Sequence, residues 1–270
     1  MTWQKLRGRF FGHHFYYTGR MIQLTLEQFF KENPKVALGF SGGVDSTYLL
    51  YAGLQYGADV RAYYVNADFQ PDFEFREALA LAGQIGTEIT VLELDALADE
   101  RVVANPPERC YYCKLAIFGA LQARALADGY HLVIDGTNAS DDASDRPGMQ
   151  ALTEMQVCSP LRECGITKAE VRRRSKEAGL PTWDKLAYAC LATRIPFGRP
   201  LTRDLLRRVE GAENVLFALG FSDFRVRVYD EAARLQFPEG QQRVALDKKA
   251  EIIGAIKPYF PIILLDLEGR

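Results

Sequence analysis

The 270-residue sequence predicts an α/β protein, with a doubly wound parallel sheet followed by a small C-terminal α/β domain. From residue 21 to about residue 185, short apolar runs typical of buried strands alternate with longer runs typical of helices. After about residue 200, period-two alternation becomes prominent and indicates a different unit. We therefore expect three parts: an extension outside the fold at 1–20, a sheet domain at 21–200 and a C-terminal domain at 201–270.

The large domain contains four strand candidates, each bounded by polar or glycine-containing segments. They are residues 36–40, 60–65, 88–94 and 131–135. Helices are expected at about 22–31, from 47 onward, at 72–85, at 112–129 and from the capping box at 167–170 to Gly179. Alternation of this kind predicts parallel strands, and ligands of such sheets bind beyond the strands' carboxyl ends.

The C-terminal domain is expected to open with a helix over 203–219, which Gly220 ends. Residues 224–229 alternate with period two, residues 233–237 do so more weakly, and residues 262–267 form an apolar run. These three segments predict the strands of a small appendage of about 70 residues.

Residues 41–46, Ser-Gly-Gly-Val-Asp-Ser, join the first predicted strand to the next helix. Gly42 and Gly43 let backbone N–H groups approach an anion without an intervening Cβ. The start of the helix adds unpaired N–H donors and the positive end of its dipole. The hydroxyls of Ser41 and Ser46 can donate further hydrogen bonds. This segment therefore predicts a phosphate-binding loop, with an ordinary glycine-rich turn as the alternative.

Within this loop, Asp45 is suited to hold a Mg²⁺ ion that accompanies the phosphates. The segment matches neither the Walker A pattern nor the dinucleotide fingerprint. It resembles the PP-loop of the ATP pyrophosphatases, which have the adenine nucleotide alpha hydrolase-like fold. That resemblance implies ATP cleavage between the α- and β-phosphates and adenylation of a substrate. Asp68 and Gly136 follow other predicted strands, so we expect both at the same nucleotide site, near the adenine.

Composition limits the possible partners and compartments. The formal net charge of −2 gives no global electrostatic case for nucleic acid, and no apolar stretch reaches about 18 residues. Five cysteines without the apolar run of a signal peptide predict a cytoplasmic protein. Closely spaced cysteines in that compartment favour metal binding or chemistry over disulfides.

Cys110 and Cys113 form a C-x-x-C pair near a predicted helix start. A redox pair, a zinc site, an iron–sulfur site and two inert thiols are all compatible with this spacing. Cys190 is either a small buried apolar residue or a thiolate favoured by the nearby cations of Lys185 and Arg194. With Cys110 and Cys113 it would supply three thiolates to a cluster. Structural roles are expected for Cys158 and Cys164, and a solvated helix face for residues 172–174.

Together these segments resemble the LarE family, ATP-dependent sulfur transferases of nickel-pincer cofactor synthesis. The resemblance runs from about Met21 to the C-terminus. The matching segments are SGGVDST at 41–47, NPPERCYYCK at 105–114, DGTNASD at 135–141, RPG at 146–148, SPL at 159–161, GITKAEVR at 165–172, PTWDK at 181–185, ACLATR at 189–194 and LDLEG at 265–269.

The resemblance implies a substrate and a reaction. ATP would adenylate a carboxylate of pyridinium-3,5-biscarboxylic acid mononucleotide, and a sulfur nucleophile would displace AMP to leave a thiocarboxylate. Some family members give up the sulfur of the cysteine matching Cys190. Members that also carry the C-x-x-C resemble cluster users, in which three cysteines hold a [4Fe–4S] cluster and a cluster-bound hydrosulfide is delivered. Because Cys110, Cys113 and Cys190 are all present, we expect the cluster type, with these residues as both metal ligands and catalytic residues.

The resemblance also implies roles for three arginines. Arg194 lies next to the sulfur site and is expected to bind the substrate carboxylate. Arg225 and Arg227 share one face of a predicted strand and are expected to bind the substrate's phosphate, with ordinary surface charges as the alternative. Family members assemble as hexamers, so a homo-oligomer is expected.

Three other functions compete with this interpretation. A tRNA thiolation enzyme also joins a PP-loop to cluster cysteines, but the net charge of −2 and the missing RNA-binding module argue against it. An amide-forming PP-loop ligase, similar to NAD synthetase, would need no cysteines. A nucleotide-sensing module would bind ATP without releasing pyrophosphate.

Overall fold

The computed structural model describes residues 16–17, 20–21, 24–141 and 146–270. Its larger domain is built on a parallel sheet with the strand order β5-β4-β3-β6. The strands are β3 (Lys35–Gly39), β4 (Asp59–Ala67), β5 (Ile89–Leu94) and β6 (Val133–Ile134). The first strand in sequence, β3, lies between β4 and β6, so the chain winds outward in both directions. The predicted doubly wound parallel sheet is thereby confirmed.

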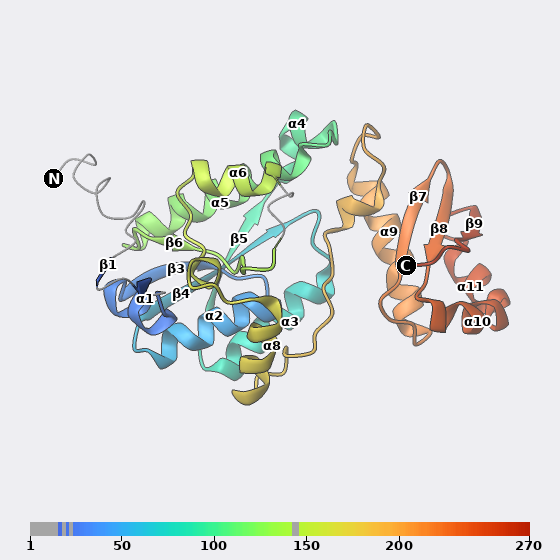
Figure 1. Cartoon of the computed structure of the whole chain (residues 1–270). Helices are drawn as coiled ribbons and strands as arrows, with labels where there is room; N and C mark the ends of the chain where they lie inside the picture. Colours follow the sequence, from blue (N-terminus) through green and yellow to red (C-terminus); the bar gives the residue numbers. More distant parts are fainter. Residues whose placement is uncertain (1–15, 18–19, 22–23, 142–145) are drawn as a thin grey trace.

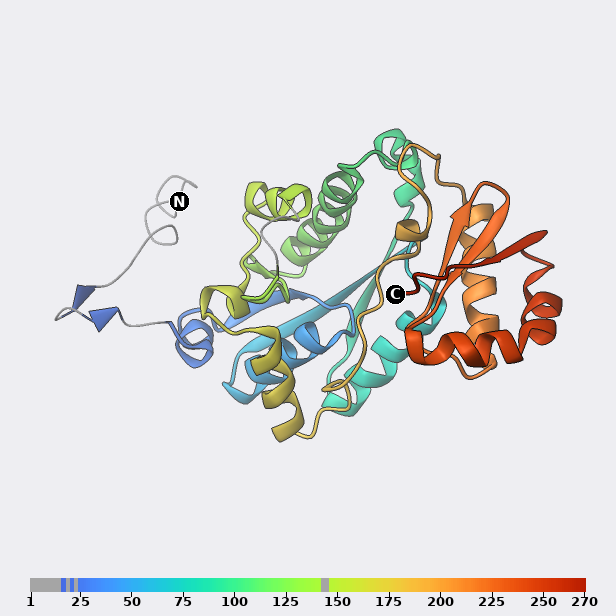
Figure 2. The ribbon, with the colours of Figure 1, turned by 45° about the vertical axis from the view of Figure 1, so that its right-hand side comes forward.

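Helices cover both faces of this sheet (Figure 1). One face carries α1 (Leu26–Glu32), α2 (Val44–Gln55), α3 (Asp72–Ile85), α7 (Pro160–Glu163) and α8 (Lys168–Glu177). The other carries α5 (Arg109–Ala127) and α6 (Arg146–Glu154), and the rotated view shows the sheet between the two layers (Figure 2). Short helical turns, η2 (Ala96–Ala98) and α4 (Glu100–Val103), lead into α5.

The strand sequences explain how one sheet fills two cores. In β3, Val36 and Leu38 pack into the layer with α1 and α2, whereas Ala37 packs into the layer with α5. In β4, Tyr64 packs into the layer with α1 and α2, and Tyr63 packs into the layer with α5. Successive side chains of a strand point to opposite faces, so runs that are apolar at every position are needed here.

The C-terminal domain packs one long helix and two short ones around a three-stranded sheet of order β7-β8-β9. Its elements are α9 (Arg203–Ala218), β7 (Arg225–Tyr229), β8 (Ala232–Gln236), α10 (Glu239–Asp247), α11 (Lys249–Ile256) and β9 (Ile262–Leu265). β7 pairs antiparallel with β8, and β8 pairs parallel with β9. The predicted small α/β domain is therefore present.

A long connection joins the two domains, and η3 (Leu191–Arg194) is its only helical turn between α8 and α9 (Figures 1 and 2). A hydrogen bond between α3 and α9 also joins the two domains. Because Pro71 at the N-cap of α3 offers no side-chain acceptor, Glu210 of α9 accepts the N–H of Asp72 at 2.8 Å. The domains therefore meet at the carboxyl edge of the parallel sheet.

Several element boundaries differ from those predicted. Helix α5 begins at Arg109, three residues before the predicted start at 112, so both cysteines of the C-x-x-C lie within its first two turns. Strand β4 extends to Ala67 and includes Asn66, which was expected to lie just beyond it. Helices α6, α10 and α11 were not predicted.

The predicted extension at 1–20 falls largely outside the described residues. Within it, β1 (Tyr16–Tyr17) is described, and it pairs antiparallel with β2 (Arg20–Met21). The proposed domain boundaries at 20 and 200 stay predictions. Among the residues that the structure describes, no helix has the length and apolar character needed to cross a membrane.

Candidate functional site

The phosphate loop lies where β3 ends and α2 begins, as predicted. Ser41 and Ser46 close it, because their hydroxyl oxygens lie 3.2 Å apart and the Ser46 hydroxyl donates to the carbonyl of Gly43. Gly42 adopts a φ of +70°, and Gly43 is the N-cap of α2 without any side-chain acceptor. The first N–H groups of α2 therefore point out of the loop without a capping partner, which is the arrangement that binds an anion.

Two glycines of this region are required by close approach. A Cβ on Gly42 would lie 2.9 Å from the Cβ of Ala78 in α3, and its positive φ disfavours side chains in any case. A Cβ on Gly136 would lie 2.9 Å from the backbone nitrogen of Ser46. Gly136 is thus packed against the first turn of α2, and the structure brings it to the phosphate loop.

Asp45 sits at the centre of a polar group beside the loop. Lys168 Nζ forms an ion pair with its carboxylate, and Asn138 Nδ2 donates to Oδ1 at 3.3 Å. Burial raises the pKa of Asp45, while the Lys168 ammonium opposes that shift. A partly buried carboxylate next to a phosphate loop is a suitable ligand for Mg²⁺. Lys168 was not predicted as a site residue, although it belongs to the GITKAEVR segment.

A second lysine reaches the same loop from the other side. Lys185 Nζ donates to the carbonyl oxygen of Gly42 at 3.1 Å and lies 2.9 Å from a carboxylate oxygen of Glu77 in α3. Lys185 was expected to lower the pKa of Cys190. The structure instead places its ammonium on the phosphate loop.

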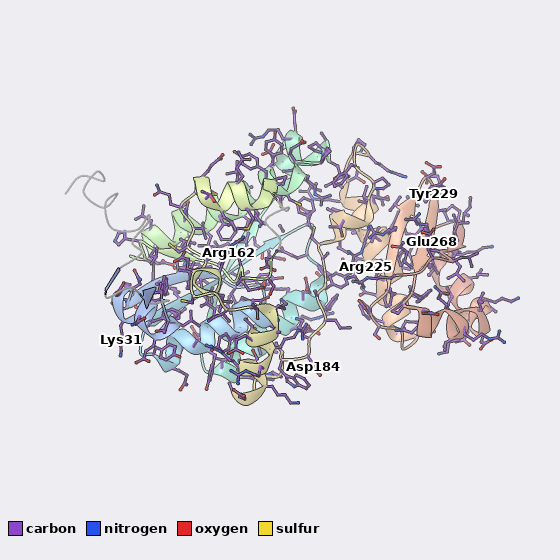
Figure 3. All side chains as sticks on the ribbon, in the orientation of Figure 1. Lys31, Arg162, Asp184, Arg225, Tyr229 and Glu268 are labelled. Atoms are coloured by element: carbon purple, nitrogen blue, oxygen red, sulfur yellow. The ribbon has the colours of Figure 1, made fainter. Side chains whose placement is uncertain are left out.

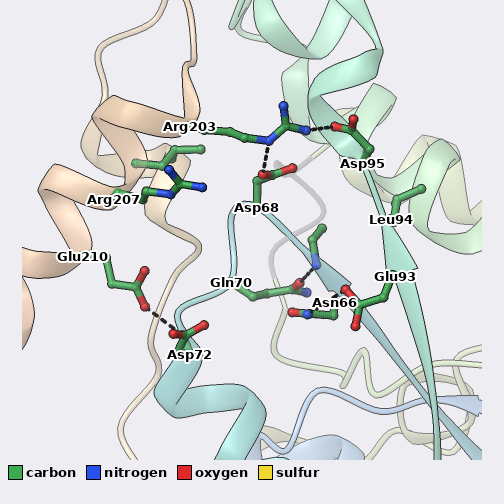
Figure 4. A pocket seen from close by; sticks show the side chains of 12 residues that line it. Asn66, Asp68, Gln70, Asp72, Glu93, Leu94, Asp95, Arg203, Arg207 and Glu210 are labelled. Carbon is green, nitrogen blue, oxygen red and sulfur yellow. Dashed lines mark hydrogen bonds and ion pairs between the residues drawn. The ribbon is translucent and has the colours of Figure 1, made fainter.

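Asp68 lies farther out along the sheet edge than the loop does. The pairing of β3 with β4 ends at Tyr63, so β4 runs four residues past it, roughly 13 Å at the rise of a strand. There a cavity of about 530 Å³ opens between the ends of β4 and β5 and helix α9 (Figure 4). Arg203 of α9 forms ion pairs with both Asp68 and Asp95 across this cavity.

The cavity is strongly charged. Carboxylates of both domains line it together with Arg203 and Arg207 (Figure 4). Its acidic residues are Asp68, Asp72, Glu93, Asp95 and Glu210. Such a lining suits a ligand that carries both a cationic ring and anionic groups. The prediction that Asp68 contacts a nucleotide stays a prediction.

The three predicted cluster cysteines are brought together from two segments. Cys110 and Cys113 lie at the start of α5, and Cys190 is the N-cap of η3. Arg109 joins the two segments, because its guanidinium lies 3.8 Å from the Cys110 sulfur and donates to the carbonyl of Ala192. The thiols of Cys110 and Cys190 both raise the pKa of Cys113 electrostatically, so the three side chains lie in one region of the structure. All three side chains are only partly exposed.

Burial dominates the protonation of these thiols. It raises the pKa of Cys113 to about 12 and also raises the pKa of Cys190. The strongest opposing cation at Cys190 is Arg109, with a smaller effect of Arg194. Of the two cations considered for Cys190, Arg194 lowers its pKa and Lys185 donates to the phosphate loop, while burial has the largest effect and raises the pKa. The choice between a buried thiol and a thiolate stays a prediction.

Cys158 and Cys164 have the surroundings of structural cysteines. Burial raises the pKa of Cys158 to about 11 and that of Cys164 to about 12. Cys158 also forms a parallel bridge with Ile134 at the edge of the sheet. None of the five cysteines forms a disulfide.

Arginines hold the irregular segment that carries Cys190. Four different guanidinium groups donate to its carbonyl oxygens, at distances between 2.7 and 3.1 Å. The pairs are Arg172 with Trp183 and Lys185, Arg225 with Ala187, Arg194 with Ala189, and Arg109 with Ala192. Arg227 adds a bond of 2.8 Å to the carbonyl of Thr193. Because this segment lacks a helix or a strand, side chains supply the donors that secondary structure would otherwise provide.

The predicted substrate arginines have other partners in the structure. Arg194 is buried and forms an ion pair with Glu213 of α9 at 2.8 Å. Arg225 is buried on β7, on the side of the C-terminal sheet that faces the large domain (Figure 3), and its pKa is lowered to about 10 by burial and by Arg194. Their contacts with substrate stay predictions. Arg172 is only partly exposed, so the expected solvated face applies to Arg173 rather than to Arg172.

Glu213 joins the Cys190 segment to the C-terminal domain. Its carboxylate accepts from Arg194, from the Tyr188 hydroxyl and from the backbone N–H of Val226 at 2.9 Å. Nothing in the sequence around Glu213 distinguishes it from a surface glutamate. Only its burial, 1% exposed, identifies it as a structural centre of the site.

Glu74 lies between the two sites on α3. It is one helical turn before Ala78, which contacts Gly42, and it follows Phe73, which packs on Tyr188 of the Cys190 segment. Burial raises the pKa of Glu74 to about 7, against the effects of Lys185, Arg194 and Arg225. One face of α3 thus extends from the phosphate loop to the Cys190 segment.

The described residues contain three thiols in one region but no compact site for a single metal ion. No group of three or more His, Cys, Asp or Glu side chains there is arranged to hold a metal ion. Because each thiolate of an iron–sulfur cubane ligates a different iron, the ligands of a cluster need more space than those of one ion. Three neighbouring thiols remain the appropriate donor set for such a cluster.

Comparison with known proteins gives relatives over most of the chain. No protein-family model matches. The chain is 39% identical over 252 residues to an uncharacterized protein of Synechocystis sp., covering 91% of this chain and 93% of that protein. It is 36% identical over 219 residues to the pyridinium-3,5-bisthiocarboxylic acid mononucleotide synthase of Lactiplantibacillus plantarum, covering 80% and 79%.

A more distant relative matches just over half of the chain. A tRNA-specific 2-thiouridylase of Clostridium botulinum is 27% identical over 190 residues, which cover 56% of this chain and 53% of that protein. The phosphate loop and these relatives confirm the expected PP-loop fold and the expected class of ATP-dependent sulfur-transferring enzyme. The chain belongs to the family of pyridinium-3,5-bisthiocarboxylic acid mononucleotide synthases, the LarE family.

Proposed function

We propose that this protein converts a carboxylate of pyridinium-3,5-biscarboxylic acid mononucleotide to a thiocarboxylate, in nickel-pincer nucleotide cofactor synthesis. The observation that carries this proposal is the position of Cys190, which is grouped with Cys110 and Cys113 of α5 and lies on the segment whose Lys185 contacts the phosphate loop. The relative from Lactiplantibacillus plantarum supports the choice of substrate, because its name describes the bisthiocarboxylic product.

The first half-reaction takes place at the phosphate loop. Ser41, Ser46 and the N–H groups at the start of α2 bind phosphates of ATP, and Asp45 holds Mg²⁺. Gly42 and Gly136 let α3 and the first turn of α2 approach the loop closely, and Gly43 leaves the N-cap of α2 without a side-chain acceptor, so its N–H groups stay available to the nucleotide. A substrate carboxylate oxygen attacks the α-phosphorus, pyrophosphate leaves, and an acyl adenylate remains. This step turns a carboxylate, which is a poor acyl donor, into an acyl donor with AMP as its leaving group.

The cavity between the domains is the proposed place of the substrate and adenosine. Its carboxylates can face the pyridinium ring, and Arg207 can pair with a carboxylate or phosphate. Asp68 contacts the nucleotide after Arg203 has given up its ion pair with Asp68. Arg194, Arg225 and Arg227 border the Cys190 segment and contribute positive charge towards the anionic substrate.

The second half-reaction takes place at the thiols. Cys110, Cys113 and Cys190 would hold a [4Fe–4S] cluster, and each would bind as a thiolate. When bound, such a cluster offers an open iron at which a sulfide can be carried to the acyl adenylate. Arg109 contributes to this site directly, because its guanidinium lies 3.8 Å from the Cys110 sulfur and bonds Asn105 and Ala192. Its positive charge lowers the pKa of Cys113 and of Cys190, against the larger effect of burial.

A reconstitution experiment tests this proposal. The protein is purified without oxygen, supplied with iron and sulfide, and assayed with ATP and the biscarboxylic mononucleotide. We expect cluster absorption, about equal amounts of AMP and thiocarboxylate, and an unchanged mass of Cys190 after turnover. A Cys158→Ala variant serves as the control, since this thiol lies at the sheet edge.

Two results would contradict the proposal. A protein that binds no cluster and loses the sulfur mass of Cys190 once per turnover would show a sacrificial mechanism. A protein that releases pyrophosphate only with an amine acceptor would be an amide-forming ligase. We also propose a cytoplasmic location. We propose a homo-oligomer, a hexamer by family resemblance, and light scattering measures its mass.

A further inference from the structure

Lys185 has a position that neither the loop motif nor the cysteines explain. It lies in the irregular connection between the domains, yet its ammonium donates to the carbonyl of Gly42 at 3.1 Å. Its second partner is Glu77, 2.9 Å away. The Lys185 side chain is 20% exposed, whereas that of Glu77 is 55% exposed. The hydrogen bond to the Gly42 carbonyl therefore holds the lysine at the loop, whereas the ion pair with the exposed Glu77 contributes little.

The chemistry of the loop indicates what this ammonium is for. A lysine has three donors, and two are used here. The neighbouring N–H groups of α2 have no capping side chain. An anion bound to them lies beside the Gly42 carbonyl, so the Lys185 ammonium is within reach of the same anion. An exposed glutamate is the partner that a phosphate replaces most easily.

We propose that Lys185 is a ligand of the terminal phosphates of ATP and of the departing pyrophosphate, exchanging Glu77 for a phosphate oxygen while keeping Gly42. This inference rests on the proposed use of ATP and assigns a further residue to the same site. Lys168, on the other side of the loop, is paired with Asp45 and so belongs to the metal side. The two lysines thereby place a positive charge at each end of the loop.

The assignment also connects the two half-reactions. Cys190 follows Lys185 by five positions in the same segment, and Arg172 holds the carbonyl of Lys185 at 2.7 Å. A phosphate bound by Lys185 therefore fixes the beginning of the segment whose middle carries the sulfur site.

Binding measurements on Lys185→Gln test the proposal with ATP, inorganic pyrophosphate and AMP as probes. Removing one charge-assisted hydrogen bond is expected to lower the affinity for ATP and for pyrophosphate roughly 10- to 100-fold. The affinity for AMP is expected to stay within about 2-fold of the wild-type value. Lys185→Arg keeps the charge and is expected to regain part of the affinity. Lys176→Gln is the control, because Lys176 of helix α8 places its ammonium over the ring of Trp183 and not on the phosphate loop.

A labelling experiment on the wild-type protein does not depend on a folded variant. We expect amine acylation of Lys185 to be slowed by pyrophosphate and not by AMP, as read by mass spectrometry. Equal weakening of AMP and ATP, or Lys185 labelling that pyrophosphate leaves unchanged, would overturn the proposal. A wild-type protein that binds ATP and pyrophosphate in this way but forms no thiocarboxylate would refute the proposed function and leave the Lys185 assignment standing.

Discussion

The phosphate loop and the Cys190 segment are built in opposite ways. The loop is a short turn between a buried strand and a helix, and regular secondary structure leaves its N–H groups pointing outward. The Cys190 segment has almost no regular structure, and arginines of α5, α8 and β7 satisfy its carbonyls. One site therefore offers donors from the backbone, and the other uses side-chain donors to fix the backbone.

This difference determines how each site responds to change. The loop depends on local geometry, so its sensitive positions are the glycines that let two backbones approach closely. The Cys190 segment depends on long-range partners, so its sensitive positions are Glu213 and the arginines. Apart from the contact of Lys185 with Gly42, the sites have separate supports, so damage away from that contact should leave the other site intact, and variants can test this separation.

Glu213→Ala is expected to have the largest effect on stability. It leaves the buried guanidinium of Arg194 without its carboxylate and removes the acceptor of the Val226 N–H. Breaking a buried ion pair costs about 3–5 kcal/mol of unfolding free energy. Urea denaturation measures the loss, and Glu231→Ala, an exposed glutamate, is the control with a change within about 0.5 kcal/mol. A loss below about 1 kcal/mol for Glu213→Ala would mean that the segment is held by other contacts.

Gly136→Ala should damage the loop and not the thiols. The new Cβ would lie 2.9 Å from the Ser46 nitrogen, and such overpacking costs about 1–3 kcal/mol. We expect ATP affinity to fall at least about 10-fold, while the alkylation rate of Cys190 stays unchanged. Gly83→Ala is the matched control, because nothing lies within 4 Å of a Cβ there and alanine favours its helix. A changed Cys190 rate would break the separation between the two sites.

Glu74→Gln tests the carboxyl that lies between the two sites. Its pKa is raised from 4.5 to about 7, so the native state holds this proton more tightly than the unfolded chain. The resulting stabilisation is complete below about pH 4.5 and is lost as the pH rises through about 7. Glutamine mimics the protonated form, so the variant should match the wild type near pH 4.5 and exceed it by roughly 2 kcal/mol at pH 8, after allowance for partial exposure. Unfolding curves at both values that show no pH-dependent difference would contradict the buried environment of Glu74.

Arg172→Ala and Arg173→Ala compare two neighbours on α8. Arg172 donates to two carbonyls of the Cys190 segment, whereas Arg173 pairs with the glutamates of its own helix. We expect a loss of about 1 kcal/mol for Arg172→Ala and within about 0.5 kcal/mol for Arg173→Ala. Thermal unfolding of both variants gives the comparison. Equal losses would show that the arginine bonds to the segment add nothing to its stability.

The sequence was sufficient for the loop because its signals are local. A strand, two glycines, two hydroxyls and a helix start occupy about a dozen consecutive residues, so Ser41 to Ser46 and the parallel sheet followed directly. The grouping of Cys110, Cys113 and Cys190 came from family motifs rather than from spacing. The partners of Arg172, Arg194 and Glu213 could not be predicted, because they join residues far apart in sequence. Lys185 was considered as a cation near Cys190 because only five positions separate the two residues, whereas the structure places its ammonium on the phosphate loop.

The central claim is that activation and sulfur transfer occur at separate residues of one site. Cys190→Ala, assayed in a single turnover with ATP and the biscarboxylic mononucleotide, tests it most directly. We expect pyrophosphate to be released and the acyl adenylate to form, while no thiocarboxylate appears. Thiocarboxylate formed at the wild-type rate, or the loss of pyrophosphate release together with the product, would contradict it.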